Sequence, residues 1–337
     1  MQLDTGIATG ALADVGRYAA AAEEMGFDGL WSVETSQDPY LPLTLVAEHT
    51  SRLRFGPAIA VAFPRSPLVH AQIAWDLQRQ SGGRFILGLG TQVKGHNERR
   101  FGIRWEAPGP RLREMIQMIR AVWDCWQNGT KPAFEGEYYR FTMMTPFFNP
   151  GPIEHPAIPI YIAGVNAYMC RLAGELCDGL HVHPFHSTRY LRDHLLPELH
   201  EGLAKSNRRR EELSLATTAF VIAGDTDEEI ERAREPVRMQ LAFYASTRTY
   251  RRILETHGWG ETSGRLNQKA AKGDWAGMAR EITDEMLDVY AISCRWDQVG
   301  EKIKEKYTGI LDRVALYVPW KPGEKNERWQ GIRRALT

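Results

Sequence analysis

Cysteine is scarce in this sequence, and its spacing is wrong for a metal finger. The chain of 337 residues has four cysteines, at positions 125, 170, 177 and 294, and no two of them form a C-x-x-C motif. This excludes a disulfide framework and a cysteine-based metal site as organising features. We expect reduced thiols, which are typical of cytoplasmic proteins.

An excess of charge of one sign and a long hydrophobic run are also lacking. The 42 Lys and Arg residues equal the 42 Asp and Glu residues in number, so no overall field favours nucleic acid or a membrane as a partner. No run approaches the ~18 apolar residues that a membrane helix needs. Asp4, Asp14 and Arg17 interrupt any stretch that could serve as a secretory signal. We therefore expect a cytoplasmic globular protein.

What the sequence has instead is a regular alternation of short apolar runs with longer amphipathic ones. Apolar runs typical of buried strands occupy residues 2–8, 29–34, 53–62, 84–90, 158–164, 178–184, 213–224 and 312–320. Amphipathic stretches that predict helices occupy residues 11–26, 42–51, 67–83, 110–129, 166–177 and 189–206. Strands that alternate with helices pair in parallel through right-handed crossovers, and eight such strands are the number in a closed (β/α)8 barrel.

The rival architecture is a doubly wound open sheet. Such a sheet usually carries a G-x-G-x-x-G turn after its first strand. The residues after the first predicted strand here, ATGALADVG (8–16), lack that spacing. We therefore predict an α/β fold of the (β/α)8 TIM-barrel type.

Two stretches are longer than ordinary connections between strands and helices. Residues 130–157 are rich in proline and aromatic residues and precede the fifth strand. Residues 225–311 hold several helical patterns but no convincing strand, which predicts an extended helical insertion before the eighth strand. Neither stretch marks a sharp change of composition, so residues 1–337 are predicted to form a single domain.

Chemistry in such a barrel belongs at the C-terminal ends of the strands. The fourth strand ends at Gly88 and Gly90, before a polar turn, and the fifth ends in AGVN (163–166). Asn166 can cap the next helix, whose free backbone N–H groups can bind phosphate, and Lys94 can add a charge-assisted bond. These two ends predict a site for a flat, phosphorylated ligand. Each end taken alone also suits an ordinary turn followed by a helix.

The end of the sixth strand allows a different chemistry. DGLHVHPFH (178–186) places His181 and His183 on the same strand face, and two imidazoles at this spacing can share a metal ion. Metal-dependent barrel hydrolases usually supply such a pair from the first strand, which has no histidine here. We therefore expect no metal, and we expect that His183 contacts substrate.

Three stretches resemble the bacterial-luciferase-like superfamily of flavin and deazaflavin oxidoreductases. They are AAEEMGFDGLWSVE (21–34), TSRLRFGPAIAVAFPRSPLVHAQIAWDLQRQSGGRFILGLGTQ (50–92) and IPIYIAGVNAYMCRLAGELCDGL (158–180). The middle one is the most specific, with a strand, R-x-P, an alanine-rich helix, S-x-G-R and L-G-L-G-T. Within the superfamily, GTQVKGHNERRFG (90–102) resembles an actinobacterial branch assigned to coenzyme F420, an 8-hydroxy-5-deazaflavin.

The resemblance implies a flat ring at the C-terminal mouth of the barrel, against a third strand kinked by a non-proline cis peptide at Ala58–Ile59. It implies that the turn after the fourth strand contacts the ring and the ribityl chain, for which the strand-end glycines leave room. It also implies that the turn after the fifth strand receives the phosphate. The positions assigned in this way to the cofactor are Ala58, Ile59, Gly90, Thr91, Gln92, Lys94, Ala163, Gly164, Val165 and Asn166.

Candidate catalytic residues follow from the same resemblance. His96 stands where some relatives place a ligand-contacting Asn, and Glu34 is a nearby carboxylate that could hydrogen-bond the ring or donate a proton. The alternative for Glu34 is a structural role, in which its carboxylate finds its hydrogen-bond partners within the barrel rim. Thr35 and Val93 stand where the relative that oxidises glucose 6-phosphate has His and Glu, which disfavours a sugar phosphate as substrate. Thr35 and His183 are the candidate substrate contacts.

We thus expect an oxidoreductase that transfers hydride between coenzyme F420 and a small, apolar or conjugated organic substrate. The main alternative is an FMN-dependent monooxygenase of the same superfamily, because the two cofactors share a tricycle and a phosphate. A metal-dependent hydrolase and a barrel that binds cofactor without turnover are more remote. The resemblance favours a homodimer or larger oligomer. Two segments together rich in Met, Phe and Tyr, residues 141–150 and 241–254, are candidate substrate walls, with packing inside the chain as the alternative.

Overall fold

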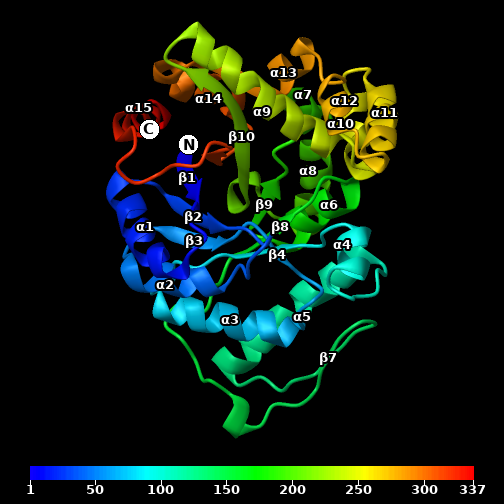
Figure 1. Cartoon of the computed structure of the whole chain (residues 1–337). Coiled ribbons are helices and arrows are strands. Elements are labelled where there is room, and N and C mark those ends of the chain that lie inside the picture. The colour runs from blue at the N-terminus through cyan, green and yellow to red at the C-terminus, as the bar shows by residue number, and fades with distance from the viewer.

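All eight predicted strands are present in the computed structural model, which describes residues 1–337. They form one parallel sheet in the order β3-β2-β1-β12-β10-β9-β8-β5-β4 (Figure 1). Their bounds are β1 (Gln2–Gly6), β2 (Gly29–Ser32), β3 (Arg54–Pro57), β4 (Ala60–Val61), β5 (Leu87–Gly90), β8 (Ile160–Ala163), β9 (Gly179–Val182), β10 (Ser214–Gly224) and β12 (Arg313–Leu316).

The third strand of the barrel consists of two short pieces, β3 and β4, whose pairing closes the sheet. β3 pairs with β2, where Leu30 lies beside Phe55, and β4 pairs with β5, where Val61 lies beside Gly90. Phe55 also forms a bridge with Phe85, just before β5. The sheet therefore returns to its starting strand, and the predicted (β/α)8 barrel is confirmed.

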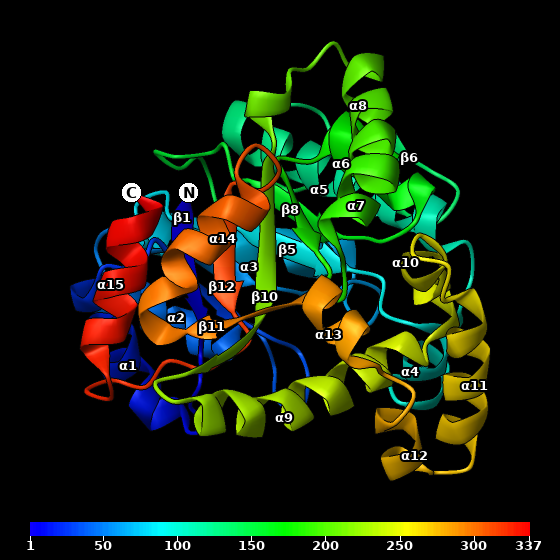
Figure 2. The same ribbon diagram turned by 90° about the horizontal axis from the view of Figure 1, so that it is seen from above.

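Helices cover the outside of the barrel (Figures 1 and 2). In α1 (Leu12–Met25), Val15, Ala19 and Ala22 are buried at helical spacing, and the helix stops at Gly26, whose φ of 90° is left-handed. The other helices of this layer are α2 (Leu41–His49), α3 (Pro67–Gln80), α5 (Pro108–Asn128), α6 (Ala167–Leu176), α7 (Thr188–Tyr190), which continues through a π turn into α8 (Leu196–Lys205), α14 (Val299–Tyr307) and α15 (Asn326–Leu336).

Polar side chains fill the inside of the barrel near the N-terminal ends of its strands. Asp4 pairs with Arg313 at 2.7 Å, with side chains 1% and 5% exposed. The indole N–H of Trp31 donates to Asp4 at 2.9 Å. Nearer the mouth, the His181 ring packs 5.0 Å from Trp31 and 5.3 Å from Tyr161, measured between ring centroids. These rings form the floor of the mouth.

The predicted insertion, residues 225–311, is helical except for one strand that the sequence analysis missed. It contains α9 (Asp227–Ala245), α10 (Arg251–Glu255), α11 (Gly260–Ala271), α12 (Trp275–Ala279), α13 (Asp284–Tyr290) and then β11 (Ala291–Arg295). β11 pairs with the outer half of β10, from Phe220 to Gly224. The expectation of no strand was wrong. β11 follows α13 directly, so no turn residues in the sequence separate the strand from the helix. β10 is 11 residues long, and β11 covers the edge that β10 presents beyond the barrel.

The proline-rich stretch at residues 130–157 forms an arm that extends from the body at the bottom of Figure 1. It contains an antiparallel hairpin of β6 (Phe134–Glu135) and β7 (Arg140–Phe141). The Glu114 carboxylate of α5 accepts hydrogen bonds from the backbone of Tyr138 at 2.8 Å and of Glu137 at 2.9 Å. These bonds tie the hairpin to the barrel.

All four cysteines are buried and free, with no disulfide between them. None of the helices combines the length and apolar character needed to cross a bilayer.

Candidate active site at the barrel mouth

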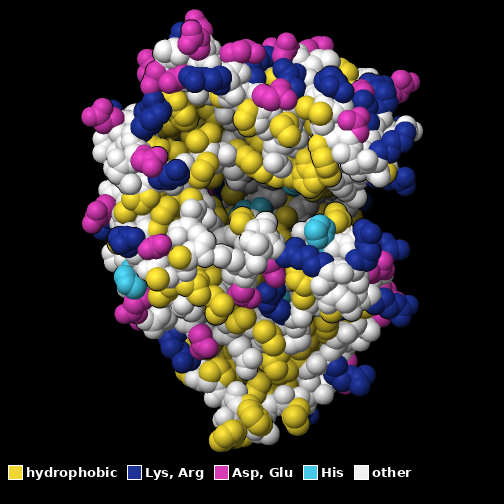
Figure 3. All heavy atoms as spheres, viewed as in Figure 1, with side chains coloured by type: hydrophobic (Ala, Val, Ile, Leu, Met, Phe, Trp, Pro, Cys, Tyr) yellow, Lys and Arg dark blue, Asp and Glu magenta, His cyan; other side chains and the backbone are white.

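The C-terminal ends of the strands surround a hollow in the face shown in Figure 3. Comparison with Figure 1 places the hollow over the ends of β4, β8 and β9, below α9. Hydrophobic side chains gather around its rim, and histidine atoms are visible inside it. This is the end of the barrel at which the cofactor and substrate residues were predicted.

The peptide bond between Ala58 and Ile59 is cis, as predicted. It lies between β3 and β4, where both residues are only partly buried. The Ala58 N–H donates to the Ser32 carbonyl at 2.7 Å, and Ala58 packs against the cluster of Trp31, Ile86 and Tyr161 at the barrel floor. The kinked segment therefore forms one wall of the mouth.

Gly88 and Gly90 lie where the third and fourth strands of the barrel approach each other closely. A Cβ atom at Gly88 would lie 1.8 Å from the Pro57 carbonyl oxygen, so only glycine fits there. A Cβ atom at Gly90 would lie 2.7 Å from the end of the Ile59 side chain. The interpretation of Gly88 as clearance for a ring is therefore corrected, because the main chain of β3 already occupies that space. Gly90 faces a movable side chain and remains a predicted ring contact.

The turn after β5 is partly helical, which the sequence analysis did not predict. Gln92 has a left-handed φ of 56°, and α4 (Lys94–Arg99) begins two residues later. Asn97 is fully buried and donates to the carbonyls of Thr91 at 2.9 Å and Val93 at 3.2 Å. Asn97 therefore stabilises the conformation of the turn. This role was not predicted, because Asn97 stands among other polar residues in the sequence.

Lys94 and His96 lie on the exposed side of α4. The Lys94 side chain is 67% exposed and pairs with Glu98 at 3.9 Å, on its own helix. The structure thus places Lys94 in an ion pair outside the turn at 163–166, to which it was expected to contribute. His96 is exposed at the same rim, and its predicted contact with a ligand stays a prediction.

The turn after β8 presents unpaired backbone donors. Asn166 caps α6 and accepts the Met169 N–H at 2.9 Å, as predicted for a capping residue. The N–H groups of Gly164, Val165 and Asn166 donate to no acceptor within the chain. The Tyr190 hydroxyl donates to the Val165 carbonyl and holds the turn from α7. Free N–H groups at the start of a ten-residue helix fit a phosphate.

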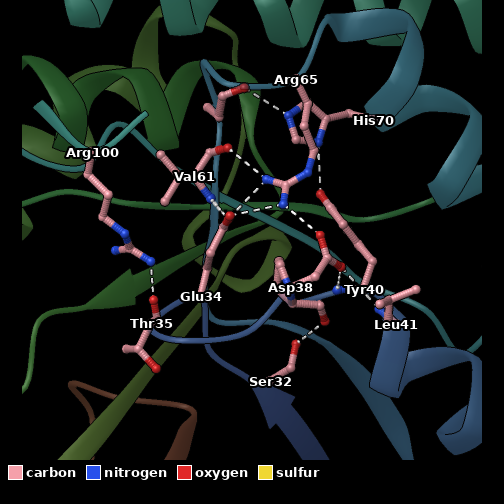
Figure 4. Close-up of polar contacts among 12 residues, drawn as sticks. Ser32, Glu34, Thr35, Asp38, Tyr40, Leu41, Val61, Arg65, His70 and Arg100 are labelled. Atoms are coloured by element: carbon pink, nitrogen blue, oxygen red, sulfur yellow. Dashed lines mark hydrogen bonds and ion pairs between the residues drawn. The ribbon is translucent and has the colours of Figure 1, made fainter. Parts of the chain in front are cut away.

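Glu34 is the centre of a buried polar network that includes Val61 of β4 (Figure 4). One carboxylate oxygen accepts the Val61 N–H at 2.6 Å and an Arg65 N–H at 3.0 Å, and the other accepts a second Arg65 N–H at 2.9 Å. Its side chain is 5% exposed. Both oxygens are thus engaged, which matches the predicted alternative of a carboxylate satisfied within the rim. Its partner Arg65 was not predicted, although this residue begins the R-x-P motif.

The network continues through Arg65 to the loop after β2. Arg65 also donates to Asp38 at 2.8 Å. Burial raises the pKa of Asp38, but the Arg65 hydrogen bond and two backbone N–H groups more than offset it, so the pKa lies below its ordinary value. Beside this pair, the Tyr40 hydroxyl contacts His70 Nδ1 at 2.8 Å, and His70 Nε2 contacts the Ala62 carbonyl at 2.9 Å. Burial lowers the pKa of His70 to about 4, so the ring is neutral at pH 7.

Thr35 and His183 lie at different sides of the mouth. Thr35 is exposed after β2, and its carbonyl accepts a hydrogen bond from Arg100, which follows α4 (Figure 4). His183 follows β9 and packs against Tyr250, with 4.2 Å between ring centroids. Burial lowers the pKa of His183 to about 3. No group of three or more His, Cys, Asp or Glu side chains is placed to hold a metal ion.

Sequence comparisons identify relatives along most of the chain. The family model described as luciferase-like monooxygenase matches residues 1–313. An uncharacterized protein of Mycobacterium tuberculosis is 44% identical over 303 residues, which cover 90% of this chain and 89% of that protein. The 5,10-methylenetetrahydromethanopterin reductase of Archaeoglobus fulgidus is 31% identical over 315 residues, which cover 91% of this chain and 90% of the reductase.

Solved structures share the fold along its whole length. The coenzyme F420-dependent tetrahydromethanopterin reductase of Methanopyrus kandleri has a TM-score of 0.78 at 21% identity and covers 99% of this chain and 98% of its own. The oxygenating constituent of 3,6-diketocamphane monooxygenase from Pseudomonas putida, in complex with FMN, has a TM-score of 0.68 at 18% identity and covers 100% and 97%. These likenesses confirm the barrel fold.

Proposed function

The chain belongs to the luciferase-like monooxygenase family, and from this premise we propose that it is an oxidoreductase that uses the deazaflavin coenzyme F420. Its substrate is proposed to be a small, apolar or conjugated organic molecule. The name of the Methanopyrus kandleri reductase, which is F420-dependent, supports the choice of cofactor.

One observation carries the proposal: the kinked third strand and the free N–H groups lie two strands apart. β4 pairs with β5, and β5 pairs with β8. Two strand spacings amount to about 10 Å, which suits a flat tricycle at Ala58–Ile59 joined through a ribityl chain to a phosphate at Gly164–Asn166. We propose that Thr91 and Gln92, which follow the intervening strand, contact that chain.

When bound, the deazaflavin supplies hydride chemistry at its C5 position. The contribution of the protein is then to hold and orient the ring, to exclude water and to place the substrate. The backbone N–H groups at 164–166 would bind the phosphate. Ala58 and Ile59 would set the plane of the ring from the opposite end of the site.

For Glu34 the contacts favour positioning over proton donation. Its carboxylate accepts from Val61 of β4 and from Arg65 after β4, and so it fixes the segment that follows the cis peptide. We therefore propose that Glu34 keeps the ring wall rigid, and that His96 at the outer rim contacts the ligand.

The second candidate function is an FMN-dependent monooxygenase, because an FMN complex is among the structures with the same fold. The phosphate site at α6 suits both cofactors. The ring of FMN supports oxygen chemistry, whereas the deazaflavin is restricted to hydride transfer. The choice between the two functions therefore depends on which cofactor the mouth prefers.

The proposal is tested by titrating the full-length chain with F420 and with FMN in parallel and measuring binding from the change in tryptophan fluorescence. We expect F420 to bind more tightly than FMN. Asn166→Ala removes the cap of α6 and should weaken F420 binding about fivefold. Thr283→Ala removes the matching cap of α13, which accepts Met286 N–H at 3.3 Å, and should leave the affinity unchanged. Preference for FMN would instead favour the monooxygenase.

A further inference from the structure

Five aromatic side chains form a wall on one side of the mouth, and we call them the tyrosine wall. Its members are His183, Phe220, Tyr244, Tyr250 and Tyr317. Three come from neighbouring barrel strands: His183 follows β9, Phe220 belongs to β10, and Tyr317 follows β12. Tyr244 lies in α9 and Tyr250 shortly after it, so the insertion supplies the rest. The wall therefore joins the barrel to the insertion.

The rings of the tyrosine wall pack closely against one another. The His183 ring lies 4.2 Å from Tyr250 and 4.6 Å from Tyr244, measured between centroids. Phe220 stacks on Tyr317 at 4.4 Å with an interplanar angle of 29°. Phe220 is 1% exposed, whereas Tyr317 is 37% exposed. Tyr317 therefore presents its ring to the open side while Phe220 supports it from behind.

The tyrosine wall faces the kinked third strand across the mouth. In the closed order, β10 is separated from β3 by β12, β1 and β2 on one side, and from β4 by β9, β8 and β5 on the other. Three strands intervene in each direction, which places β10 directly opposite the kink. A flat ring at Ala58–Ile59 would therefore leave the space beside Tyr317 and Tyr244 for a second molecule.

The polar feature of the tyrosine wall is a pair of hydroxyl groups. The Tyr244 and Tyr317 hydroxyls are 2.6 Å apart, and either one can be the donor. Two hydroxyls carry two protons, and their mutual hydrogen bond uses one of them. The second O–H is left to donate to a ligand in the mouth. An oxygen acceptor is the natural partner for it.

The tyrosine wall carries no charge at neutral pH. Burial raises the pKa of Tyr244 and of Tyr317 above the ordinary value, so both stay protonated. Burial holds the pKa of His183 at about 3, so its ring is neutral. A charged ligand placed here would lose hydration without gaining a counter-ion, which is unfavourable. Aromatic faces instead favour flat conjugated molecules.

We infer that the tyrosine wall is the substrate side of the mouth, and that it selects a neutral, flat, conjugated molecule with a carbonyl oxygen. The free O–H of the Tyr244–Tyr317 pair holds that oxygen, and the aromatic rings hold the conjugated body. The inference rests on the proposed function in one respect, namely that the opposite wall belongs to the cofactor ring. It adds to that function a substrate class and the residues that select it.

Binding of three naphthalenes of similar shape tests separately the contributions of the hydroxyl groups, the aromatic rings and the lack of charge in the tyrosine wall. 2-Acetylnaphthalene has the carbonyl, 2-ethylnaphthalene lacks the oxygen, and 2-naphthoate carries a charge. Their binding to the full-length chain is measured by calorimetry, with and without F420. We expect 2-acetylnaphthalene to bind about fivefold more tightly than 2-ethylnaphthalene, as one hydrogen bond allows, and 2-naphthoate to bind most weakly.

The double variant Tyr244→Phe with Tyr317→Phe removes both hydroxyls and keeps the rings. We expect its affinity for 2-acetylnaphthalene to fall about fivefold, to the level of 2-ethylnaphthalene. Its unchanged affinity for 2-ethylnaphthalene would show that the wall remains folded. Tyr138→Phe makes the same chemical change in the hairpin of the arm, between β6 and β7, and should change neither affinity.

Equal affinity of the double variant and the wild type for 2-acetylnaphthalene would overturn the inference, and so would tightest binding of 2-naphthoate or no binding of any probe. F420 binding in the same samples distinguishes this failure from failure of the proposed function. If F420 binds and the hydroxyls have no effect, only the substrate assignment is wrong. If F420 does not bind but the ketone still depends on the hydroxyls, the tyrosine wall stands and the proposed cofactor is wrong.

Discussion

Two segments of similar composition have opposite surroundings in this protein. Residues 141–150 are rich in Met and Phe, residues 241–254 contain Phe and Tyr, and either segment could form a wall of the mouth. In the structure, Tyr244 and Tyr250 of the second segment pack at the mouth. In the first segment, Phe147 is 89% exposed on the arm. Aromatic composition alone therefore does not show where a segment lies, because the fold decides whether its side chains face the mouth or the solvent.

The same contrast holds for charged groups in the two regions. Arg65 at the mouth is 18% exposed and pairs with Glu34, which is 5% exposed. Arg140 in the arm is 70% exposed and pairs with Glu135 at 3.7 Å. An ion pair of the first kind holds two elements together, whereas one of the second kind competes with water. The mouth is therefore the region where single substitutions should have large effects.

Arg65→Ala should give the largest effect. It leaves the Glu34 carboxylate buried without its partner, and we expect the free energy of unfolding to fall by about 3–5 kcal/mol. Arg140→Ala is the matched change in the arm and should cost less than about 1 kcal/mol. Urea unfolding of both variants measures the difference. Equal losses would mean that the network in Figure 4 does not hold the mouth.

Leu254→Ala tests the packing of the second segment. Leu254 is fully buried, so its truncation should reduce the free energy of unfolding by about 3 kcal/mol. Phe147→Ala removes a larger side chain from the arm, yet it should change stability by less than about 0.5 kcal/mol. Thermal unfolding and urea titration of the two variants compare them directly. A large loss of stability in Phe147→Ala would show that Phe147 is buried by other groups in solution.

Acid should weaken the protein through the buried histidines of the mouth. The pKa of His70 is about 4 in the folded state and about 6.5 in an unfolded chain. The unfolded state therefore binds the proton first as the pH falls, and stability that is complete above about pH 6.5 is lost toward pH 4. At pH 5 the loss attributable to His70 is about 2 kcal/mol.

His70→Gln should remove this part of the pH dependence. Urea unfolding at pH 7.5 and pH 5 should show a smaller drop for the variant than for the wild type, whatever its stability at pH 7.5. His155→Gln changes an exposed histidine near the arm and should retain the full drop. The same drop in His70→Gln and the wild type would contradict the assignment of the titration to His70.

Much of the fold was predictable from the sequence. The alternation of apolar and amphipathic runs located all eight barrel strands, because strand and helix periods leave a local pattern of burial. β11 was missed because its neighbour, the outer half of β10, is supplied by residues about 70 positions away. α4 was missed because its six residues are polar on most sides. Both elements depend on contacts that no short stretch of sequence encodes.

The candidate site was predictable in part. The resemblance placed the cis peptide at Ala58–Ile59, and the structure confirms it. The capping role of Asn166 followed from its place after a strand, and the structure confirms it as well. The partners of Glu34 and of Tyr244 could not be predicted. Glu34 lies 31 positions from Arg65, and Tyr244 lies 73 positions from Tyr317, so neither pair leaves a recognisable spacing.

The sequence alone therefore determined the barrel, the strand ends that surround its mouth, and the family to which the chain is related, since each depends on patterns within continuous stretches of the chain. Only the tertiary structure decided that Arg65 neutralises Glu34, that Gly88 makes room for a neighbouring strand, and that one of two aromatic segments meets the mouth. The physical reason is that burial and hydrogen bonding are set by groups distant in the chain, which closure of the barrel brings together.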